Sequence, residues 1–441
     1  MVHFIPTTPE EEVQLLNGAA VSNFSELIKI IPQKFRLTGD LGIGTPFSEM
    51  EIERELIQLS NSNAADNFCF SGGGVYDHFI PKAVDFISGR SEYYTSYTPY
   101  QAEVSQGTLQ YLYEFQSMIC EISGMDIANA SLYDGSSAIA EACLLAHSFT
   151  RSKIILYSGS LNPHYLQVVK SYLTGQDMEL IQIPEINGIT DLNALKSYSE
   201  NIAALIIQSP NKNGLIENWM ESKKKMLDPK SLLIAVSEPL SLSVLEPPGK
   251  CGADIFVGEG QSLGNPMSYG GPLLGLIAVK EQYKRRIPGR IIGKTVDKNN
   301  NDGFVLTLQT REQHIRREKA TSNICTNQGL LALRATIYLA LMGKKGMPYI
   351  ANICHQKARY AANGISELEN YSLPYSNEFL MEFVVKTTHS AIDVTNYCAA
   401  KGVSIMRALT DESDSLLLIA VTEKRTIDEI NHLIKCLKEF S

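Results

Sequence analysis

Ala203-Ala-Leu-Ile-Ile207, Leu232-Leu-Ile-Ala-Val236 and Asp254-Ile-Phe-Val257 are the stretches that decide the fold. Each is a short, unbroken apolar run rather than an alternation of polar and apolar residues. Runs of this kind are typical of strands covered on both faces, which occur mainly in parallel sheets. Amphipathic segments lie between several such runs, so the sequence predicts a large α/β domain built on a mostly parallel sheet.

The same alternation extends on both sides of these runs. Further strands are predicted over 153–157, 179–183 and 273–279, and helices over 101–124, 163–173 and 191–200. Beyond residue 370, strands are predicted over 379–386 and 416–421 and helices over 392–400 and 426–440. Capping signals at Thr8 and Asn23 predict helix starts near the N-terminus. We therefore expect a helical segment 1–100, a large α/β domain 101–350 and a small α+β domain 351–441.

The composition excludes several classes of protein. The 441 residues include 39 Lys and Arg against 48 Asp and Glu, for a net charge of −9, so the basic field that attracts nucleic acids is lacking. No stretch of sequence has the length and hydropathy of a membrane span, and the first residues do not resemble a signal peptide. The eight cysteines form no CxxC pair, which argues against a zinc ribbon or a disulfide framework. We expect a cytoplasmic protein that uses no metal, nucleic acid or membrane.

A large parallel-sheet domain followed by a small α+β domain is the layout of the large pyridoxal-phosphate enzymes, with an aspartate aminotransferase-like fold. This step is analogy, because one fold serves many functions. Such a site needs a phosphate cradle at a helix N-terminus, an acid beside the pyridine nitrogen and a lysine that binds the coenzyme. Asp134, Gly135, Ser136 and Ser137 precede a predicted helix and are the cradle candidates. An ordinary turn capped by Asp134 or Ser136 is the alternative.

The expected lysine is missing from the place where this fold carries it. The turn after the 254–257 strand reads Gly258-Glu-Gly-Gln-Ser-Leu-Gly264, and neither Gln261 nor Ser262 has the amine that a covalent bond to an aldehyde requires. Lys250 and Lys280 flank the stretch, but neither is well placed. Glu238 follows the 232–236 strand and is the candidate acid, with a solvated loop carboxylate as the alternative. The sequence therefore predicts the architecture without its nucleophile.

A tyrosine-rich loop precedes the long helix that begins near residue 101. The candidate residues in it are Tyr93, Tyr94, Ser96, Tyr97, Tyr100 and Gln101. Rigid phenol rings with hydroxyl groups suit an interface or a ligand channel. Packing within the chain is the alternative interpretation.

Other charged residues carry weaker signals. Arg311, Arg316, Arg317 and Lys319 lie on a predicted helix, whose default interpretation is a solvated face and whose alternative is a docking surface for an acidic partner. Arg407 in the small domain could bind a substrate carboxylate, although a surface ion pair is simpler.

Several motifs in combination resemble a known family. They are Tyr97-Thr-Pro-Tyr-Gln-Ala-Glu-Val-Ser-Gln-Gly107, Leu132-Tyr-Asp-Gly-Ser-Ser137, Val257-Gly-Glu-Gly-Gln-Ser-Leu-Gly264, Pro288-Gly-Arg290 and Leu306-Thr-Leu-Gln-Thr-Arg-Glu-Gln313. They resemble the P-protein of the glycine cleavage system, and in particular its first (alpha) subunit in organisms where the enzyme is split into two chains. The resemblance extends over essentially the whole sequence.

This resemblance implies a heteromer with a second subunit, α2β2 in arrangement, that decarboxylates glycine on pyridoxal phosphate and passes the aminomethyl group to the lipoyl arm of the H-protein. The family's coenzyme-binding lysine belongs to the second subunit, so the resemblance implies no catalytic residue in this chain. It also implies that the tyrosine-rich loop is this chain's contribution to a shared site or to the partner interface. Two alternatives stay open: a self-sufficient pyridoxal-phosphate decarboxylase or aminotransferase that uses a residue such as Lys280, and a purely scaffolding or regulatory relative.

Overall fold

The computed structural model describes the chain except for residues 1–6, 40, 64–66, 199–200, 411–412 and 441. The chain divides into two compact units, Met1–Ala65 and Asp66–Ser441. Among the residues described, no helix has the length and apolar character needed to cross a membrane.

The first unit is made of short helices and turns. Its α-helices are α1 (Pro9–Gly18), α2 (Phe24–Leu27) and α3 (Glu49–Asn61), and η1 (Ile28–Ile30) and η2 (Gln33–Phe35) are 3-10 turns. The helix starts predicted at Thr8 and Asn23 are confirmed, since the Thr8 side chain accepts from the Glu11 amide and the Asn23 side chain from the Glu26 amide. None of the residues described in this unit is buried, so the unit has no core of its own.

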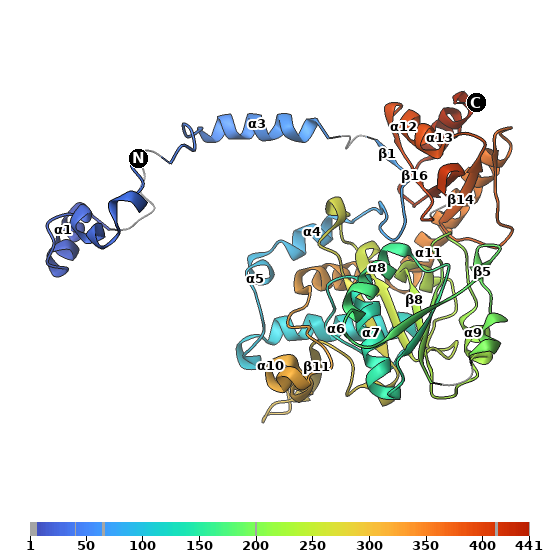
Figure 1. The fold of residues 1–441 in the computed structure, drawn as a ribbon, viewed down its shortest axis with the longest axis horizontal. Helices are drawn as coiled ribbons and strands as arrows, with labels where there is room; N and C mark the ends of the chain where they lie inside the picture. The colour runs from blue at the N-terminus through green and yellow to red at the C-terminus, as the bar shows by residue number, and fades with distance from the viewer. Residues whose placement is uncertain (1–6, 40, 64–66, 199–200, 411–412, 441) are drawn as a thin grey trace. The chain divides into compact units, whose positions relative to one another are not determined.

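A seven-stranded sheet organises the second unit (Figure 1). Its strands, in spatial order, are β2 (Ile127–Ala128), β10 (Gly275–Val279), β9 (Ile255–Glu259), β8 (Leu232–Ser237), β7 (Ile202–Gln208), β3 (Ile154–Ser158) and β4 (Glu179–Ile183). The five strands from β9 to β4 are parallel, as predicted, whereas β10 runs antiparallel to both β9 and β2. The connection from β9 to β10 contains only the 3-10 turns η6 (Gly260–Ser262) and η7 (Ser268–Gly270) and no α-helix, whereas a parallel crossover is usually an α-helix.

Helices cover both faces of this sheet. Alternate strand residues belong to two separate cores: Leu205 and Leu233 face one, and Ile206 and Ile234 face the other. The first core includes side chains of α6 (Gln106–Ser123) and α11 (Gly329–Ser366), and the second those of α7 (Gly135–Thr150) and α8 (Pro163–Leu173). Burial on both faces explains why the strands are unbroken apolar runs.

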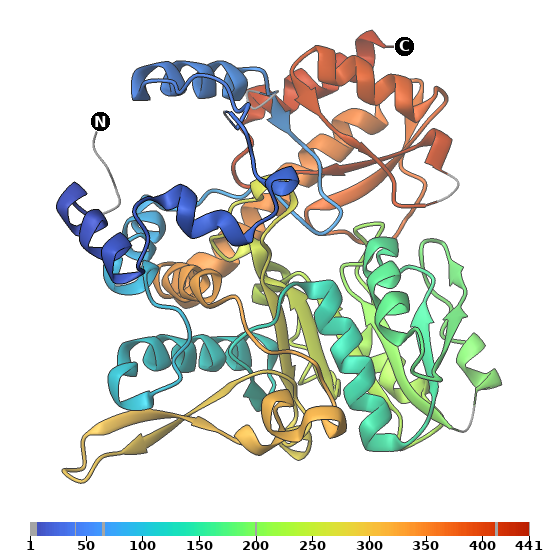
Figure 2. The same cartoon turned by 60° about the vertical axis from the view of Figure 1, so that its left-hand side comes forward.

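Three predicted elements differ from the structure, and one hairpin was not predicted. The long helix begins at Gln106, and Val104 lies in a 3-10 turn and is 79% exposed. The stretch 191–198 contains only the 3-10 turn η4 (Ala194–Ser197), and residues 199–200 of that predicted helix lie outside the described residues. The polar loop near residue 300 joins a hairpin, β11 (Ile291–Val296) and β12 (Asp302–Thr307), that extends from the sheet in Figure 2. The helix predicted for Arg311–Lys319 is instead three short turns, because Arg317 has φ +54°.

A second, antiparallel sheet follows the long helix α11. Its strands in spatial order are β13 (Tyr371–Ser372), β14 (Glu382–Thr387), β17 (Leu416–Ala420) and β16 (Met406–Arg407), with α12 (Ala391–Ala400) and α13 (Ile427–Glu439) alongside. These strands and helices match the predicted α+β unit. The segment just after the first unit joins the same region, since β1 (Phe68–Cys69) pairs with β15 (Val403–Ser404).

The three-part division stays a prediction. Its boundary at residue 350 falls inside α11, which runs from Gly329 to Ser366 and has one non-helical residue, Gly343. The parts on either side of that boundary share a continuous helix.

Substitution of a glycine in the loop after β7 tests how closely this loop approaches β14. A Cβ at Gly214 would lie 1.9 Å from the backbone oxygen of Glu382 in β14, and its φ is +78°. We expect Gly214→Ala to lower the free energy of unfolding by at least about 3 kcal/mol. Gly175→Ala is the matched control, because Gly175 has φ +82° with nothing within 4 Å of a Cβ, and it should cost only about 1–2 kcal/mol. Chemical denaturation measures both, and equal losses would contradict the close approach.

Candidate active site

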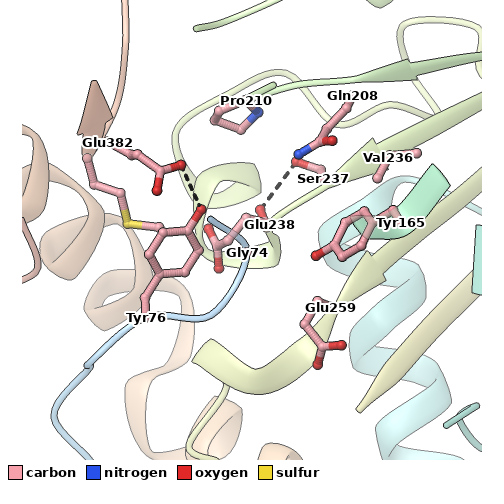
Figure 3. Close-up of a pocket in the computed structure, with 11 residues that line it drawn as sticks. Gly74, Tyr76, Tyr165, Gln208, Pro210, Val236, Ser237, Glu238, Glu259 and Glu382 are labelled. Carbon is pink, nitrogen blue, oxygen red and sulfur yellow. Dashed lines mark hydrogen bonds between the residues drawn. The ribbon is translucent and has the colours of Figure 1, made fainter. Parts of the chain in front are cut away.

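A small cavity lies at the carboxyl ends of β7, β8 and β9, the edge where open α/β sheets bind ligands (Figure 3). Its volume is about 20 Å³, enough for about one water molecule. The residues that line it are Gly74, Tyr76, Tyr165, Gln208, Pro210, Val236, Ser237, Glu238, Glu259, Met381 and Glu382. They come from the strand ends of the central and small sheets and the turns beside them, from α8 and from the segment after β1, and none of them is a lysine.

Three carboxyl groups face this cavity, and burial raises the pKa of each. The pKa of Glu259 rises to about 8 and that of Glu382 to about 7, while the pKa of Glu238 also lies above its usual value. Removal from water disfavours the charged form, and the hydrogen bonds that each group accepts offset this only in part. Glu259 therefore keeps its proton at neutral pH, and Glu382 is partly protonated there.

The predicted cradle is present, but two of its amides, those of Gly135 and Ser137, are already paired with carboxyl groups of the chain. Asp134 caps α7, and its Oδ1 accepts from the Ser137 amide at 2.8 Å and from the Ser136 hydroxyl. The Gly135 amide donates to Glu259 Oε2 at 2.9 Å. A coenzyme phosphate would have to displace both carboxyl groups from these donors. Asp134 therefore acts as the cap of the alternative interpretation, and Glu259 accepts from the amide of the first residue of α7.

Glu259 itself is held by two further amides. Its Oε1 accepts from Leu274 at 2.9 Å and from Gln261 at 3.1 Å. The side chain is 5% exposed. With a cavity of water size, no lining lysine and cradle amides that are already paired, the residues present do not fit pyridoxal phosphate.

The turn that was expected to carry the lysine serves the packing of the chain. Gln261 is buried; its Oε1 accepts from the Tyr76 amide at 2.9 Å, and its Nε2 donates to the carbonyl oxygens of Tyr76 and Asn265. The Ser262 hydroxyl donates to Glu238 Oε1. Glu238 also accepts from the amides of Leu240 and Ser241, both at 2.9 Å. Glu238 is thus neither a freely solvated loop carboxylate nor a free acid: it caps the turn that follows β8.

Glu238 is the only lining residue that the sequence analysis named as a candidate, and Glu382 and Tyr76 are among those that it missed. Glu382 accepts from the Gly73 amide at 2.6 Å and from the Tyr76 hydroxyl at 3.1 Å (Figure 3). The available signal was a lone acid inside the apolar stretch Phe379-Leu-Met-Glu-Phe-Val-Val385, because a buried strand keeps a carboxyl group only where it has partners. Tyr76 carried no such signal, since its neighbours in space are distant in sequence.

The tyrosine-rich loop is placed apart from this cavity, since none of its residues lines it. It begins with the short helix α5 (Ser91–Tyr94), which the prediction of an irregular stretch did not include. Tyr94, Tyr97 and Tyr100 are 67%, 84% and 74% exposed, so packing within the chain does not account for them. Tyr93, by contrast, packs edge-on against Tyr111.

The remaining two residues of the loop are polar. Ser96 donates to the Glu92 carbonyl oxygen at 2.9 Å, and Gln101 is exposed. The Arg290 guanidinium lies 6.0 Å from the centre of the Tyr100 ring and donates to the carbonyl oxygen of Cys325. Cys325 is the one exposed cysteine of the eight.

The other charged candidates do not line the cavity. Arg316, Arg317 and Lys319 are exposed, in keeping with a solvated face. Arg311 donates to the carbonyl oxygens of Ile287 and Gly289, so it holds a loop rather than lying on a solvated face. Arg407 is exposed on β16.

A second buried cluster joins three parts of this unit. His78 Nδ1 lies 2.7 Å from Glu423 Oε2, and the Cys354 thiol donates to the same oxygen at 3.3 Å. Burial alone would raise the pKa of Glu423, but the hydrogen bond and the charge of His78 lower it to about 2. Burial would lower the pKa of His78, yet Glu423 raises it overall. An ion pair therefore connects the segment after β1 to the segment after β17, beside α11.

The comparisons with known proteins agree with this architecture. The chain matches the family "Glycine cleavage system P-protein" over residues 2–437. It is 47% identical to the probable glycine dehydrogenase (decarboxylating) subunit 1 of Chloroherpeton thalassium, over 99% of each chain. It superposes on a crystal structure of the glycine decarboxylase (P-protein) of the glycine cleavage system, in inhibitor-bound form, with a TM-score of 0.93 and 36% identity over 100% of both chains. A C-DES variant with glycine covalently linked to its PLP cofactor shares the fold at TM-score 0.64 and 12% identity, over 86% of this chain and 97% of that one.

These matches show that the fold is that of the pyridoxal-phosphate-dependent transferases, as predicted. At this identity and coverage, the chain belongs to the glycine cleavage system P-protein family, and within it to the relatives called subunit 1.

The Glu259 carboxyl group gives a prediction for stability against pH. A group whose pKa is raised on folding stabilises the folded state below its unfolded pKa, and this stabilisation is lost as the pH rises through the folded pKa. For Glu259 the window runs from its ordinary value near 4.5 to about 8. We expect the free energy of unfolding to fall from pH 5 to pH 9, and Glu259→Gln to make this dependence weaker.

Glu259→Gln should also cost about 1–3 kcal/mol at pH 5, because a side-chain amide cannot accept from all three backbone donors. The difference in the free energy of unfolding between Glu259→Gln and wild type should become smaller towards pH 9. Glu318→Gln, at an exposed carboxyl group, is the control and should follow the wild-type profile. Urea unfolding across this pH range checks both statements. If the free energy of unfolding of Glu259→Gln depended on pH as strongly as that of wild type, this would contradict the raised pKa.

Proposed function

We propose that this chain is the subunit of a glycine-decarboxylating heteromer that does not itself bind pyridoxal phosphate. The observation that carries the proposal is the hydrogen bond from the Gly135 amide to Glu259, which occupies the cradle with a side chain of the same polypeptide. Coenzyme, lysine and chemistry then belong to a second subunit, and this chain is active only in complex with it. The subunit 1 name of the relatives supports the existence of that partner.

The self-sufficient alternative finds no support in the position of Lys280. Val279 pairs with Ile255 at the start of β9, whereas the cavity lies at Glu259, at the other end of that strand. The Lys280 ammonium also donates to the carbonyl oxygen of Gly124. Lys280 therefore lies at the wrong edge of the sheet for a coenzyme at the cradle.

Within the heteromer we assign this chain a structural and a site-shaping role. The exposed rings of Tyr94, Tyr97 and Tyr100 offer an apolar surface with hydroxyl groups, which suits an interface core or the wall of a shared pocket. The relatives' name supports glycine as the substrate. We further propose an α2β2 arrangement and a lipoylated H-protein that accepts the aminomethyl group, as the family resemblance of the sequence implies. The free state of the cysteines and the acidic net charge suit a cytoplasmic enzyme.

Reconstitution tests the division of labour. The isolated chain with added pyridoxal phosphate should show no new visible absorption band, no borohydride-stable adduct beyond that of its own unfolded form, and no release of CO₂ from glycine. The unfolded sample corrects for reaction at surface lysines. With subunit 2 and lipoylated H-protein present, CO₂ release should appear. A stoichiometric adduct at one lysine of the folded, isolated chain would overturn the proposal.

Substitutions in the tyrosine-rich loop distinguish a role in a shared active site from a purely scaffolding role. In the reconstituted complex, we expect the double variant Tyr97→Phe/Tyr100→Phe to lower turnover about 10-fold, which is about 1.4 kcal/mol of barrier. Tyr349→Phe, at a ring that is 68% exposed on α11, is the control and should leave turnover unchanged. Normal turnover of the double variant in an intact complex would favour a purely scaffolding chain.

A further inference from the structure

The buried cluster of His78, Cys354 and Glu423 brings together three kinds of side chain that bind transition metals. Nδ1 of His78 lies 2.7 Å from Oε2 of Glu423, and Sγ of Cys354 lies 3.3 Å from the same oxygen. The three atoms lie within 4.8 Å of one another, and among the described residues no other group of three or more His, Cys, Asp and Glu side chains is as close. The residues are distant in sequence, so no spacing motif indicates the cluster.

The distances in this cluster are near those of a zinc site. Zinc binds His nitrogen at about 2.0–2.1 Å, Cys sulfur at about 2.3 Å and Glu oxygen at about 2.0–2.2 Å, usually as a tetrahedron. Two such ligand atoms therefore lie roughly 3.3–3.6 Å apart around one ion. The distance from Cys354 to Glu423 already has this value. The distance from His78 to Glu423 would have to widen by roughly 0.6 Å, and the Glu423 side chain, which is 13% exposed, has room to turn.

Hydrogen bonds around the cluster direct the ligand atoms to one place. The Phe79 amide donates to Oε1 of Glu423 at 2.7 Å, which leaves Oε2 for the cluster. The Glu423 amide donates to Sγ of Cys354 at 3.1 Å, and a hydrogen bond of this kind favours the thiolate form of a cysteine. Outer hydrogen bonds that orient the ligands are typical of metal sites.

A buried hydroxyl group beside the cluster has no partner in the described part of the chain. Tyr338 is 1% exposed, and its hydroxyl makes no hydrogen bond there. Burial raises the pKa of Tyr338, and the charges of Glu423 and Cys354 add to this effect, so the hydroxyl lies near both. A zinc ion with three protein ligands keeps its fourth position for water. An unpartnered hydroxyl is a hydrogen-bond partner that such a water needs.

We infer that His78, Cys354 and Glu423 form a binding site for one Zn²⁺ ion, which joins the segment after β1, α11 and the segment after β17. The ion replaces the Nδ1 proton of His78 and the thiol proton of Cys354, and both protons pass to solvent. The net charge of the cluster is zero before and after this exchange, so binding leaves no uncompensated charge in the interior. A nitrogen, sulfur and oxygen donor set suits zinc, whereas Mg²⁺ and Ca²⁺ take oxygen ligands.

Zinc binding to the full-length chain tests the site. After treatment with a chelator, wild type should take up one Zn²⁺ per chain, measured by competition with a chromophoric chelator. Cys354→Ser should bind at least about 100-fold more weakly, since loss of an outer partner alone typically costs about 10–100-fold. Cys325→Ser is the matched control, because it removes the exposed thiol and should bind within about 3-fold of wild type. Zinc should raise the thermal midpoint of wild type and of this control, but not that of Cys354→Ser.

Spectroscopy of the wild-type chain identifies the ligands without relying on the folding of a variant. X-ray absorption of the zinc-loaded chain should show one sulfur at about 2.3 Å and nitrogen or oxygen ligands at about 2.0–2.1 Å. With Co²⁺ in place of Zn²⁺, a thiolate-to-cobalt charge-transfer band should appear in wild type and Cys325→Ser and be absent from Cys354→Ser.

Three results would overturn the zinc site. They are no stoichiometric uptake of Zn²⁺ by wild type, an ion bound by nitrogen and oxygen alone, and a charge-transfer band that Cys354→Ser retains. The cluster would then be an ion pair with a hydrogen-bonded thiol. Each of these measurements uses the isolated chain, so the proposed heteromer stands or falls separately.

Discussion

The carboxyl group of Glu259 is the interaction on which the site depends. It ends β9 and accepts from the first amide of α7, from the turn that follows β9 and from the entry to β10. Three backbone donors on one buried acid join three elements that would otherwise have unpaired amides in the interior. One of these donors, the Gly135 amide, belongs to the predicted phosphate cradle. The acceptor is a side chain of the same polypeptide, so all three donors are already paired at this edge of the sheet.

Buried hydrogen bonds also connect this edge of the central sheet to the small sheet. Tyr76 pairs with Gln261 through its backbone and with Glu382 through its hydroxyl, and the Gly73 amide donates to Glu382 as well. A Cβ at Gly72 would lie 2.0 Å from Glu382 Oε1, so only glycine permits this approach. The His78–Glu423 pair continues the connection a few residues further along. The segment after β1 is therefore held on both sides by buried polar groups, and the two sheets are fixed around a space of water size.

The sequence was sufficient for the features that one local pattern determines. The strands β7, β8 and β9 were predictable because a strand covered on both faces must be apolar throughout, and α7 because Asp134-Gly-Ser-Ser137 is a cap. The antiparallel direction of β10 depends on the path of the connection over residues 260–274, which lacks a crossover helix and whose course the pattern does not show. Arg311 resembled a surface residue, because nothing in a local window indicates that carbonyl oxygens some twenty residues earlier accept from it. Glu382 and Tyr76 meet only in three dimensions, and this is why the composition of the cavity was beyond sequence reasoning.

One thiol offers direct access to the tyrosine-rich loop. Cys325 is the exposed member of the eight cysteines, and its carbonyl oxygen is bound by Arg290, whose guanidinium lies near the ring of Tyr100. A maleimide fluorophore would therefore attach to the native chain beside that loop, with no engineered site required. Its emission would report on the surroundings of the phenol rings while other proteins are added, at concentrations far below those that calorimetry needs.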